Sequence, residues 1–154
     1  MEYLIAKWVH VLSSTLLFGT GIGSAFYMLM ACLNRDARIA YFVVRKVVIA
    51  DWLFTATSVV VQPVTGLYLM NRLGLPLTAG WIFWSIVLYL VAGACWLPVV
   101  WLQIRMRDLA HDAARADQPL PAEYWRYFRA WFALGIPAFV ALLVVFYLMV
   151  AKPG

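Results

Sequence analysis

His10 is the residue of this sequence that is hardest to explain by packing alone. It lies in the first of four long apolar segments, whereas the second histidine, His111, lies outside all of them. An ionisable ring in hydrocarbon is costly unless it has a partner or a task. An imidazole on a membrane helix can ligate a heme iron, take part in quinone or proton chemistry, or hydrogen-bond to a neighbouring helix. These three interpretations of His10 stay open.

The residues around His10 on the first segment favour a flat, anionic ligand such as heme b. Helical spacing places Lys7, Ser14 and Gly21 on the same side as His10. A lysine one turn away suits the carboxylates of heme propionates. Gly21 has no side chain and leaves room for a macrocycle. We therefore expect His10 to be the axial metal ligand and Lys7 to be a propionate partner.

Polar residues of two other segments are expected at the depth of His10. A rise of about 1.5 Å per residue brings Gln62, Thr65 and Ser85 to a similar level, where Gln62 and Thr65 would supply hydrogen bonds. The predicted cofactor site opens toward the outer face and contains His10, Lys7, Ser14, Gly21, Gln62, Thr65 and Ser85.

A second axial ligand is not defined by the sequence. His111 is expected in the cytoplasm, about a membrane thickness away from His10. A sixth ligand would come from a second copy of the chain, from another subunit, or from Met or Lys7; otherwise that position stays open. No motif assigns a reaction, so the question of enzymatic activity also stays open.

The composition identifies the kind of protein that positions these residues. Of 154 residues, 66% are hydrophobic and 12% are charged. A soluble domain of this length exposes too much surface to hide so many apolar side chains. Four segments, at about 3–33, 47–70, 81–104 and 131–150, reach the roughly 20 residues that a membrane-spanning helix needs. We expect an all-α integral membrane bundle of four antiparallel helices, forming one domain over residues 1–154. The first segment is too long for a cleaved signal sequence.

The positions of lysine and arginine predict the orientation. Nine of the twelve follow the first and third segments, in the expected loops 34–46 and 105–130. Cytoplasmic loops carry such an excess, so both termini are expected on the outer, periplasmic side. The net charge of +5 then reflects topology and anionic membrane lipid, and nothing in it suggests nucleic acid.

The second segment carries a polar stripe. Its members recur at intervals of four, three, four and three, which places them on one helical face: Asp51, Thr55, Ser58, Gln62 and Thr65. Lipid cannot satisfy such groups, so the stripe should point into the bundle. Asp51 is expected to reach water or the basic loops, and the sequence leaves open whether it titrates or caps the start of its helix. Pro63 removes a backbone donor and leaves the carbonyl of Val59 without its usual partner.

Small residues on the first segment predict a close helix contact. Gly19 and Gly23 are four residues apart, a spacing that lets another backbone approach, either within the bundle or in a homo-oligomer. Cys32 and Cys95 match no metal motif and are expected to be reduced packing residues.

Two runs of the sequence resemble a known family. They are Lys7-Trp8-Val9-His10, followed by Gly19 to Gly23, and Pro63-Val64-Thr65-Gly66-Leu67-Tyr68. These runs are similar to the HemJ-type protoporphyrinogen oxidases, small four-helix membrane proteins that bind heme b. The resemblance implies that His10 is the heme-associated histidine. The third segment has Phe83, Trp84 and Ser85 where that family carries a functional basic residue, so heme binding is implied rather than the oxidase activity.

Runs over most of the chain resemble a second family. They lie at 10–23, 50–57, 62–66 and 95–105 and are similar to an uncharacterised bacterial family of predicted integral membrane proteins. This resemblance implies a multi-pass protein of the bacterial inner membrane and supplies no activity. The expected function is a heme-b-binding membrane protein with a redox or redox-accessory role, with a redox protein or a second copy as partner. The alternatives are a non-enzymatic accessory or oligomerising subunit, and a quinone or proton site.

Overall fold

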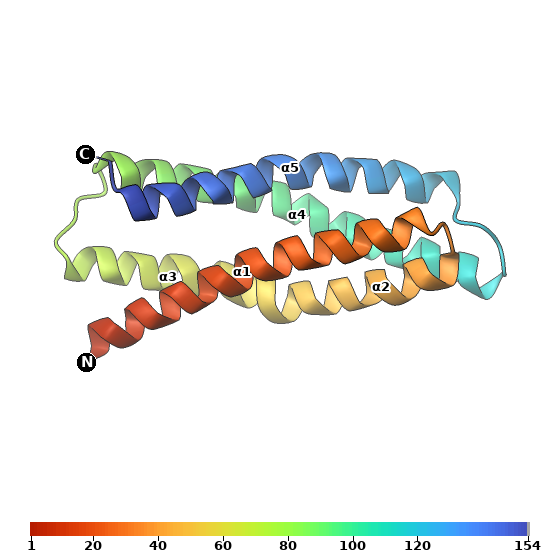
Figure 1. Ribbon diagram of the computed structural model, residues 1–154, viewed down its shortest axis with the longest axis horizontal. Helices are drawn as coiled ribbons and strands as arrows, with labels where there is room; N and C mark the ends of the chain where they lie inside the picture. Colours follow the sequence, from red (N-terminus) through yellow and green to blue (C-terminus); the bar gives the residue numbers. More distant parts are fainter. Residues whose placement is uncertain (154) are drawn as a thin grey trace.

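The computed structural model describes residues 1–153, and its regular structure is entirely helical (Figure 1). The elements are α1 (Glu2–Leu33), α2 (Ala37–Ala50), the π-helical turn η1 (Asp51–Thr55), α3 (Ala56–Arg72), α4 (Gly80–Arg115) and α5 (Ala122–Ala151). Because α2, η1 and α3 follow one another without a break, they form one rod. The described chain therefore has four helical rods, each long and apolar enough to cross a membrane.

The rods begin and end outside the apolar segments of the sequence. α2 begins at Ala37 rather than near residue 47, and α4 continues to Arg115 rather than ending near residue 104. The start of α2 is defined by Asp36, whose carboxylate accepts hydrogen bonds from the backbone N–H of Arg38 and Ile39, at 2.7 and 3.2 Å. The apolar segments end where the chain is expected to leave the membrane, but the helices continue beyond those points. The non-helical parts of the two expected loops therefore shrink to 34–36 and 116–121.

The rods pair along their length. Figure 1 shows both termini at the same end of the molecule, with α1 lying over α2 and α3, and with α4 beside α5. The most extensive packing joins α4 to α5, followed by α2 to α4 and α1 to α3. His10 on α1 and the polar stripe on η1 and α3 are thus carried by two rods that pack against each other.

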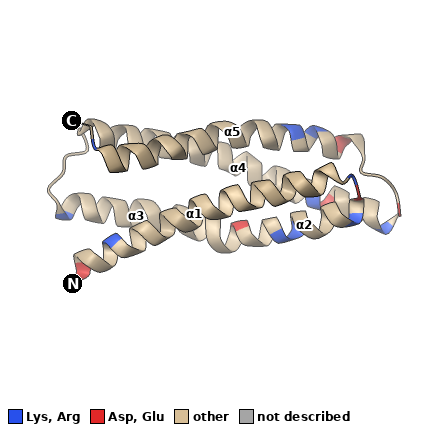
Figure 2. Cartoon of the chain, in the orientation of Figure 1, with Lys and Arg blue, Asp and Glu red and all other residues tan. Residues whose placement is uncertain are grey.

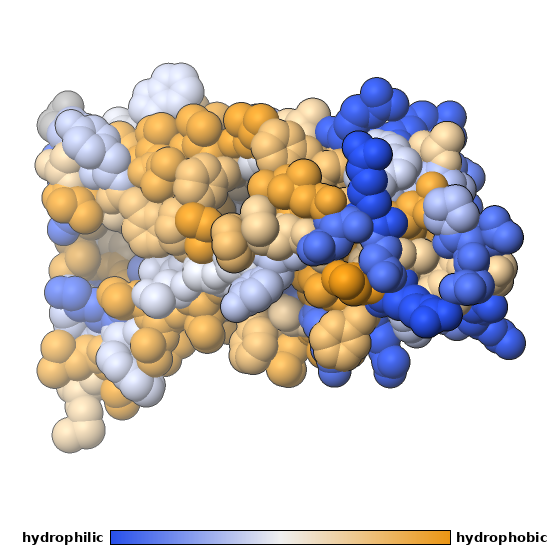
Figure 3. Space-filling model, turned by 45° about the vertical axis from the view of Figure 1, so that its right-hand side comes forward, coloured by the Kyte–Doolittle hydropathy of each residue, from blue (hydrophilic) through white to orange (hydrophobic). Residues whose placement is uncertain are grey.

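The tightly packed core lies toward the end where α1 turns into α2 and α4 turns into α5. Its fully buried side chains include Met28, Val44, Met106 and Tyr124. Lysines and arginines gather over the same end of the molecule, whereas apolar side chains cover most of the remaining face in view (Figures 2 and 3). One end of the bundle therefore combines a buried apolar core with a charged surface, as soluble proteins do. The rest exposes apolar side chains, as membrane proteins do.

Toward the termini, the rods are joined by fewer contacts. The ring of Phe18 on α1 lies 5.3 Å from the rings of both Phe139 and Phe146 on α5. Between α3 and α4, the hydroxyl of Tyr89 donates a hydrogen bond to the carbonyl of Val59 at 2.8 Å. This carbonyl is the one that Pro63 leaves without its helical donor, so Tyr89 supplies the missing partner.

Candidate functional site

His10 is held between α1 and α3 by a defined set of hydrogen bonds. Its Nδ1 lies 2.8 Å from the hydroxyl oxygen of Thr65. That hydroxyl donates its own hydrogen to the carbonyl of Val61, at 2.7 Å. With that hydrogen on Val61, Thr65 accepts at His10, and we assign the ring hydrogen to Nδ1 on this ground. In the neutral imidazole, this assignment leaves the lone pair on Nε2, one of the two ring nitrogens through which a histidine can ligate a metal.

A second pair of side chains orients the other edge of the ring. Ser13 donates to Oε1 of Gln62 and also lies 3.0 Å from the backbone oxygen of His10. Because Oε1 is engaged by Ser13, the amide nitrogen of Gln62 faces Nε2 of His10, at 3.4 Å. This distance is long for a hydrogen bond, whose usual length is about 3.0 Å. Nε2 is thus only weakly engaged. We call these four side chains, His10, Ser13, Gln62 and Thr65, the His10 cluster.

Gly66 allows the two helices to approach at this point. A Cβ atom added to Gly66 would lie 3.2 Å from Cε1 of His10. Contacts this short are tighter than ordinary van der Waals packing, so a side chain here would push against the imidazole. The absence of a side chain at Gly66 therefore lets the His10 ring fit between α1 and α3. The sequence analysis did not single out Gly66.

Lys7 and Gly21 lie outside the His10 cluster. Lys7 is exposed on α1, one turn closer to the N-terminus than His10. Gly21 is also exposed and has no neighbouring atom within 4 Å of the position of a Cβ. It lies eleven residues beyond His10, about 17 Å along the helix axis at 1.5 Å per residue. The structure does not bring Gly21 to the imidazole.

The two predicted serines also lie apart from the cluster. Ser14 donates within its own helix to the carbonyl of Val11, at 2.7 Å. Ser85 is buried but donates to the carbonyl of Trp81, at 2.6 Å. The serine that meets Gln62 is Ser13, which the sequence analysis missed. Its signal was present, because a residue three positions from His10 lies on nearly the same helical face as one four positions away.

The described residues contain no group of three or more His, Cys, Asp or Glu side chains that could hold a metal ion. Cys32 and Cys95 form no disulfide among the described residues. A bare metal ion therefore has no donor set around His10. A heme iron is different, because the macrocycle supplies four ligands and the protein needs to supply only one or two.

The half of the polar stripe that lies farther from the termini is more deeply buried than the half that meets His10. Asp51, Thr55 and Ser58 are 4%, 5% and 3% exposed, so the prediction that they point into the bundle is confirmed. The prediction that Asp51 reaches water is wrong, and Asp51 does not cap the start of a helix. Asp51 lies inside the continuous rod at the start of η1, and the hydroxyl of Thr55 donates to its Oδ1 at 2.9 Å.

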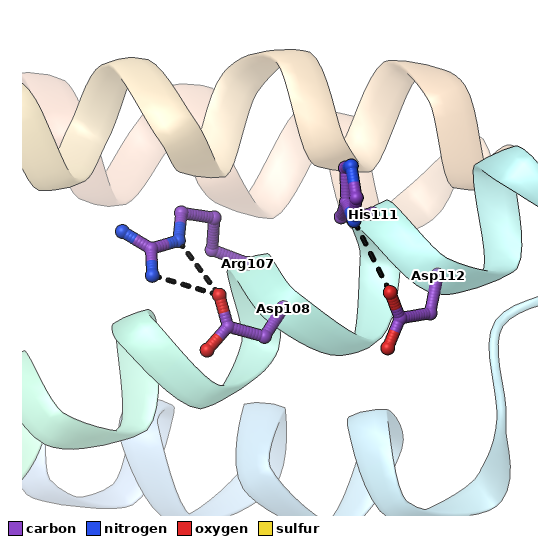
Figure 4. A network of polar contacts seen from close by, with 4 residues as sticks. All are labelled: Arg107, Asp108, His111 and Asp112. Atoms are coloured by element: carbon purple, nitrogen blue, oxygen red, sulfur yellow. Dashed lines mark hydrogen bonds and ion pairs between the residues drawn. The ribbon is translucent and has the colours of Figure 1, made fainter.

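His111 lies on the extension of α4, away from the His10 cluster. Its Nδ1 is 3.1 Å from Oδ1 of Asp112, and its ring lies 5.0 Å from that of Tyr41. One turn earlier, Arg107 forms an ion pair with Asp108 at 2.7 Å (Figure 4). These are contacts of a solvated helix surface, and none of them reaches His10.

Comparison with known families places the chain in one of them. Residues 4–153 match the family described as "Predicted integral membrane protein (DUF2269)". No curated protein and no solved structure matches the chain. The resemblance to an uncharacterised membrane protein family is confirmed, whereas the resemblance to HemJ-type oxidases finds no support. Because the match covers nearly the whole sequence, the chain belongs to the DUF2269 family of predicted integral membrane proteins.

Proposed function

We propose that this integral membrane protein binds heme b, with Nε2 of His10 as an axial ligand. The observation that carries the proposal is the hydrogen bond from Nδ1 of His10 to Thr65. Metal-ligating histidines commonly donate their second ring N–H to an oxygen, which fixes the tautomer and the ring orientation. Thr65 is placed to do this for His10.

The residues around Nε2 fit a heme iron at the donor atom. Only the Gln62 amide faces Nε2, and at 3.4 Å it is held loosely enough to turn aside. Lys7, exposed one turn away, would pair with a propionate. Gly21 is not part of this site, because it lies too far along α1 to border the same macrocycle. When bound, heme b would supply one-electron exchange between ferrous and ferric iron, consistent with a redox or redox-accessory role.

The proposal includes an orientation in the membrane. The rods would run antiparallel as a single domain, with both termini on the periplasmic side of a bacterial inner membrane. Two observations support this: both termini lie at one end of the molecule, and the basic side chains gather at the other (Figures 1 and 2). Positive residues favour the cytoplasmic side. His10 then lies in the periplasmic half, where an electron partner outside the cytoplasm would reach it.

An absorption spectrum of detergent-purified protein tests the heme proposal. Protein from heme-replete cells is expected to show a Soret band. His10→Ala should lose at least nine-tenths of that band, because it removes the ligand. His111→Ala is the matched control and should keep it. A colourless wild-type protein, or equal bands in both variants, would contradict the proposal.

A second candidate is a structural role for the same cluster in a non-enzymatic accessory subunit. It is favoured by the fact that both ring nitrogens of His10 contact residues of one neighbouring helix. Hydrogen bonds between membrane helices contribute about 1 kcal/mol each, enough to hold α1 against α3. This candidate predicts no Soret band and a loss of thermal stability in His10→Ala. The same purified variants therefore separate the two functions.

We also propose that α1 associates with a second copy through Gly19 and Gly23. Apart from the adjoining part of α1 itself, no atom of the described chain lies within 4 Å of the Cβ positions of these glycines, so the close contact expected of them is not made within the bundle. Gly19→Leu and Gly23→Leu should therefore leave the monomer folded and lower the dimer fraction at least tenfold, measured by light scattering in detergent. The control is Gly135→Leu on α5, which also has open space. An unchanged oligomeric state in both α1 variants would contradict this interface.

A further inference from the structure

A surface cavity lies at the end of the bundle opposite to the termini, where the α1–α2 connection meets the α4–α5 connection (Figure 1). It has a volume of about 340 Å³ and is lined by Arg35, Pro119, Leu120 and Trp125. An adjoining cavity of about 270 Å³ shares Arg35 and Pro119 with it. We call the first one the Arg35 cavity. Its lining includes no residue of the His10 cluster.

The walls of the Arg35 cavity are held in place by the core beneath them. Leu120 is 7% exposed and belongs to that core. The ring of Trp125 lies 5.6 Å from the ring of Tyr124, which is fully buried. The two connections are joined by the ion pair between Arg38 and Asp117, at 2.8 Å. The cavity is therefore a feature of the folded chain and needs no rearrangement to form.

The positive charge of Arg35 has no acidic partner in the described chain. Its guanidinium carbon lies 6.0 Å from the centre of the Trp125 ring, within the range of a cation–π contact. None of the salt bridges among residues 1–153 involves Arg35. The carboxylates of the adjoining cavity are already engaged, because Asp36 accepts from the backbone at the start of α2 and Asp117 pairs with Arg38. The Arg35 cavity thus presents one uncompensated positive charge.

The start of α5 adds partial positive charge beside this arginine. α5 begins at Ala122, between the cavity-lining residues Leu120 and Trp125, and no side chain caps it. The N–H groups of a first helical turn lack helical partners, and their partial positive charge favours anions. The one acid of this turn, Glu123, accepts a hydrogen bond from the hydroxyl of Tyr127 at 2.6 Å. The arginine and the helix start therefore favour the same kind of ligand, an anion.

The level of the cavity along the bundle indicates which anion can reach it. Leu33, two residues before Arg35, is 66% exposed and ends the apolar surface of α1. Arginine and tryptophan side chains are typical of this boundary between lipid and water. A phospholipid carries its phosphate at the boundary and its acyl chains on the apolar side. An anionic phospholipid would supply the missing negative charge, whereas a zwitterionic one also brings a positive group that the engaged carboxylates leave unpaired.

We propose that the Arg35 cavity binds the headgroup of one anionic phospholipid, whose phosphate pairs with the guanidinium of Arg35 beside Trp125. The planar guanidinium can donate two parallel N–H groups to phosphate oxygens. Pro119 and Leu120 line the same cavity and would contact the apolar part of the lipid. Basic pockets of membrane proteins bind anionic headgroups in this way. The site depends neither on heme nor on the orientation of the chain in the membrane.

Native mass spectrometry of the detergent-purified protein tests the proposal. The protein is mixed with equal amounts of phosphatidylglycerol and phosphatidylcholine that have the same acyl chains. One phosphatidylglycerol per chain should be retained, in about fivefold excess over phosphatidylcholine, the ratio expected of one well-placed cationic contact. Inorganic phosphate, added in excess over the lipid, should not displace it, because it lacks the acyl chains.

Two variants locate the bound lipid. Arg35→Gln removes the charge and should abolish the preference for phosphatidylglycerol. Arg35 is exposed and has a left-handed backbone, with φ of 56°, which glutamine tolerates as well as arginine because both are unbranched at Cβ. The variant should therefore fold. Arg45→Gln is the matched control, because it removes an exposed arginine of α2 that lies outside the cavity and forms no salt bridge among the described residues. It should keep the preference.

Three outcomes would overturn the proposal. The first is equal retention of the two lipids by the wild-type protein. The second is a ratio that Arg35→Gln leaves unchanged, or that Arg45→Gln lowers by as much, since the lipid would then follow the overall positive charge. The third is displacement of the lipid by inorganic phosphate, which would make the cavity a site for free anions. None of these outcomes involves a Soret band, so this proposal and the heme proposal fail separately.

Discussion

Replacing Tyr124 with alanine is expected to lower the free energy of unfolding by about 3–5 kcal/mol, the usual cost of truncating a buried aromatic side chain. Tyr124 is fully buried in the core, at the end of the bundle opposite to the two termini. Its hydroxyl lies 3.1 Å from the sulfur of Cys32, so the ring fastens the start of α5 to the end of α1. Charged residues gather at this end of the bundle, as expected for a part that faces water, so the hydrophobic effect should contribute in full to the packing of this core.

The measurement is thermal unfolding in detergent, followed by tryptophan fluorescence. The midpoint should fall by about 10 °C for Tyr124→Ala. Tyr124→Phe removes only the contact with Cys32 and should cost about 1 kcal/mol. Tyr147→Ala is the matched control on the same helix, because that side chain is 67% exposed and should change the midpoint little. Equal effects at positions 124 and 147 would show that the core does not control stability.

The four rods were predictable because each contains a long apolar segment whose minimum length is set by the thickness of the bilayer. A helix that crosses a bilayer needs about 20 apolar residues whatever its neighbours are, so composition alone indicates four spans. The ends of the rods were not predictable in the same way. Residues 37–46 and 105–115 are polar enough to leave the membrane, yet they remain helical because the N-cap at Asp36 and the packing of α2 on α4 continue past its edge.

The polar stripe shows which features the spacing of polar residues can predict and which it cannot. Spacings of three and four predicted that Asp51, Thr55 and Ser58 would be buried together, and they are. The same spacing could not predict the π-helical turn, because its change of hydrogen-bond register leaves no composition signal.

The His10 cluster was predicted in part, for a similar reason. Gln62 and Thr65 follow from depth and helical face, and both reach His10. Depth alone also selected Ser85, but a shared level on two helices does not establish contact unless those helices face each other there. α1 faces α3, so the site contains residues of α3 and none of α4.

Gly66→Leu is expected to displace the His10 ring from its position between α1 and α3. Even the Cβ of the new side chain would lie 3.2 Å from Cε1 of His10, and the remaining carbons need space that the helix contact does not have. Either the imidazole turns out or α1 separates from α3, and both outcomes break the hydrogen bond to Thr65. Overpacking of this kind costs about 1–3 kcal/mol, to which the lost hydrogen bonds add.

Nitrogen NMR of histidine-labelled protein would report this change directly. The chain has two histidines, so a His111→Ala background leaves His10 as the only signal. In that background, the ring should show a hydrogen fixed on Nδ1. After Gly66→Leu it should show the averaged pattern of an imidazole that exchanges between tautomers. Gly93→Leu, at a glycine with open space around it, should leave the signal unchanged. If the Gly66→Leu variant keeps the fixed tautomer, then Thr65 holds the ring whether or not α1 and α3 approach closely. The role assigned to Gly66 would then be wrong.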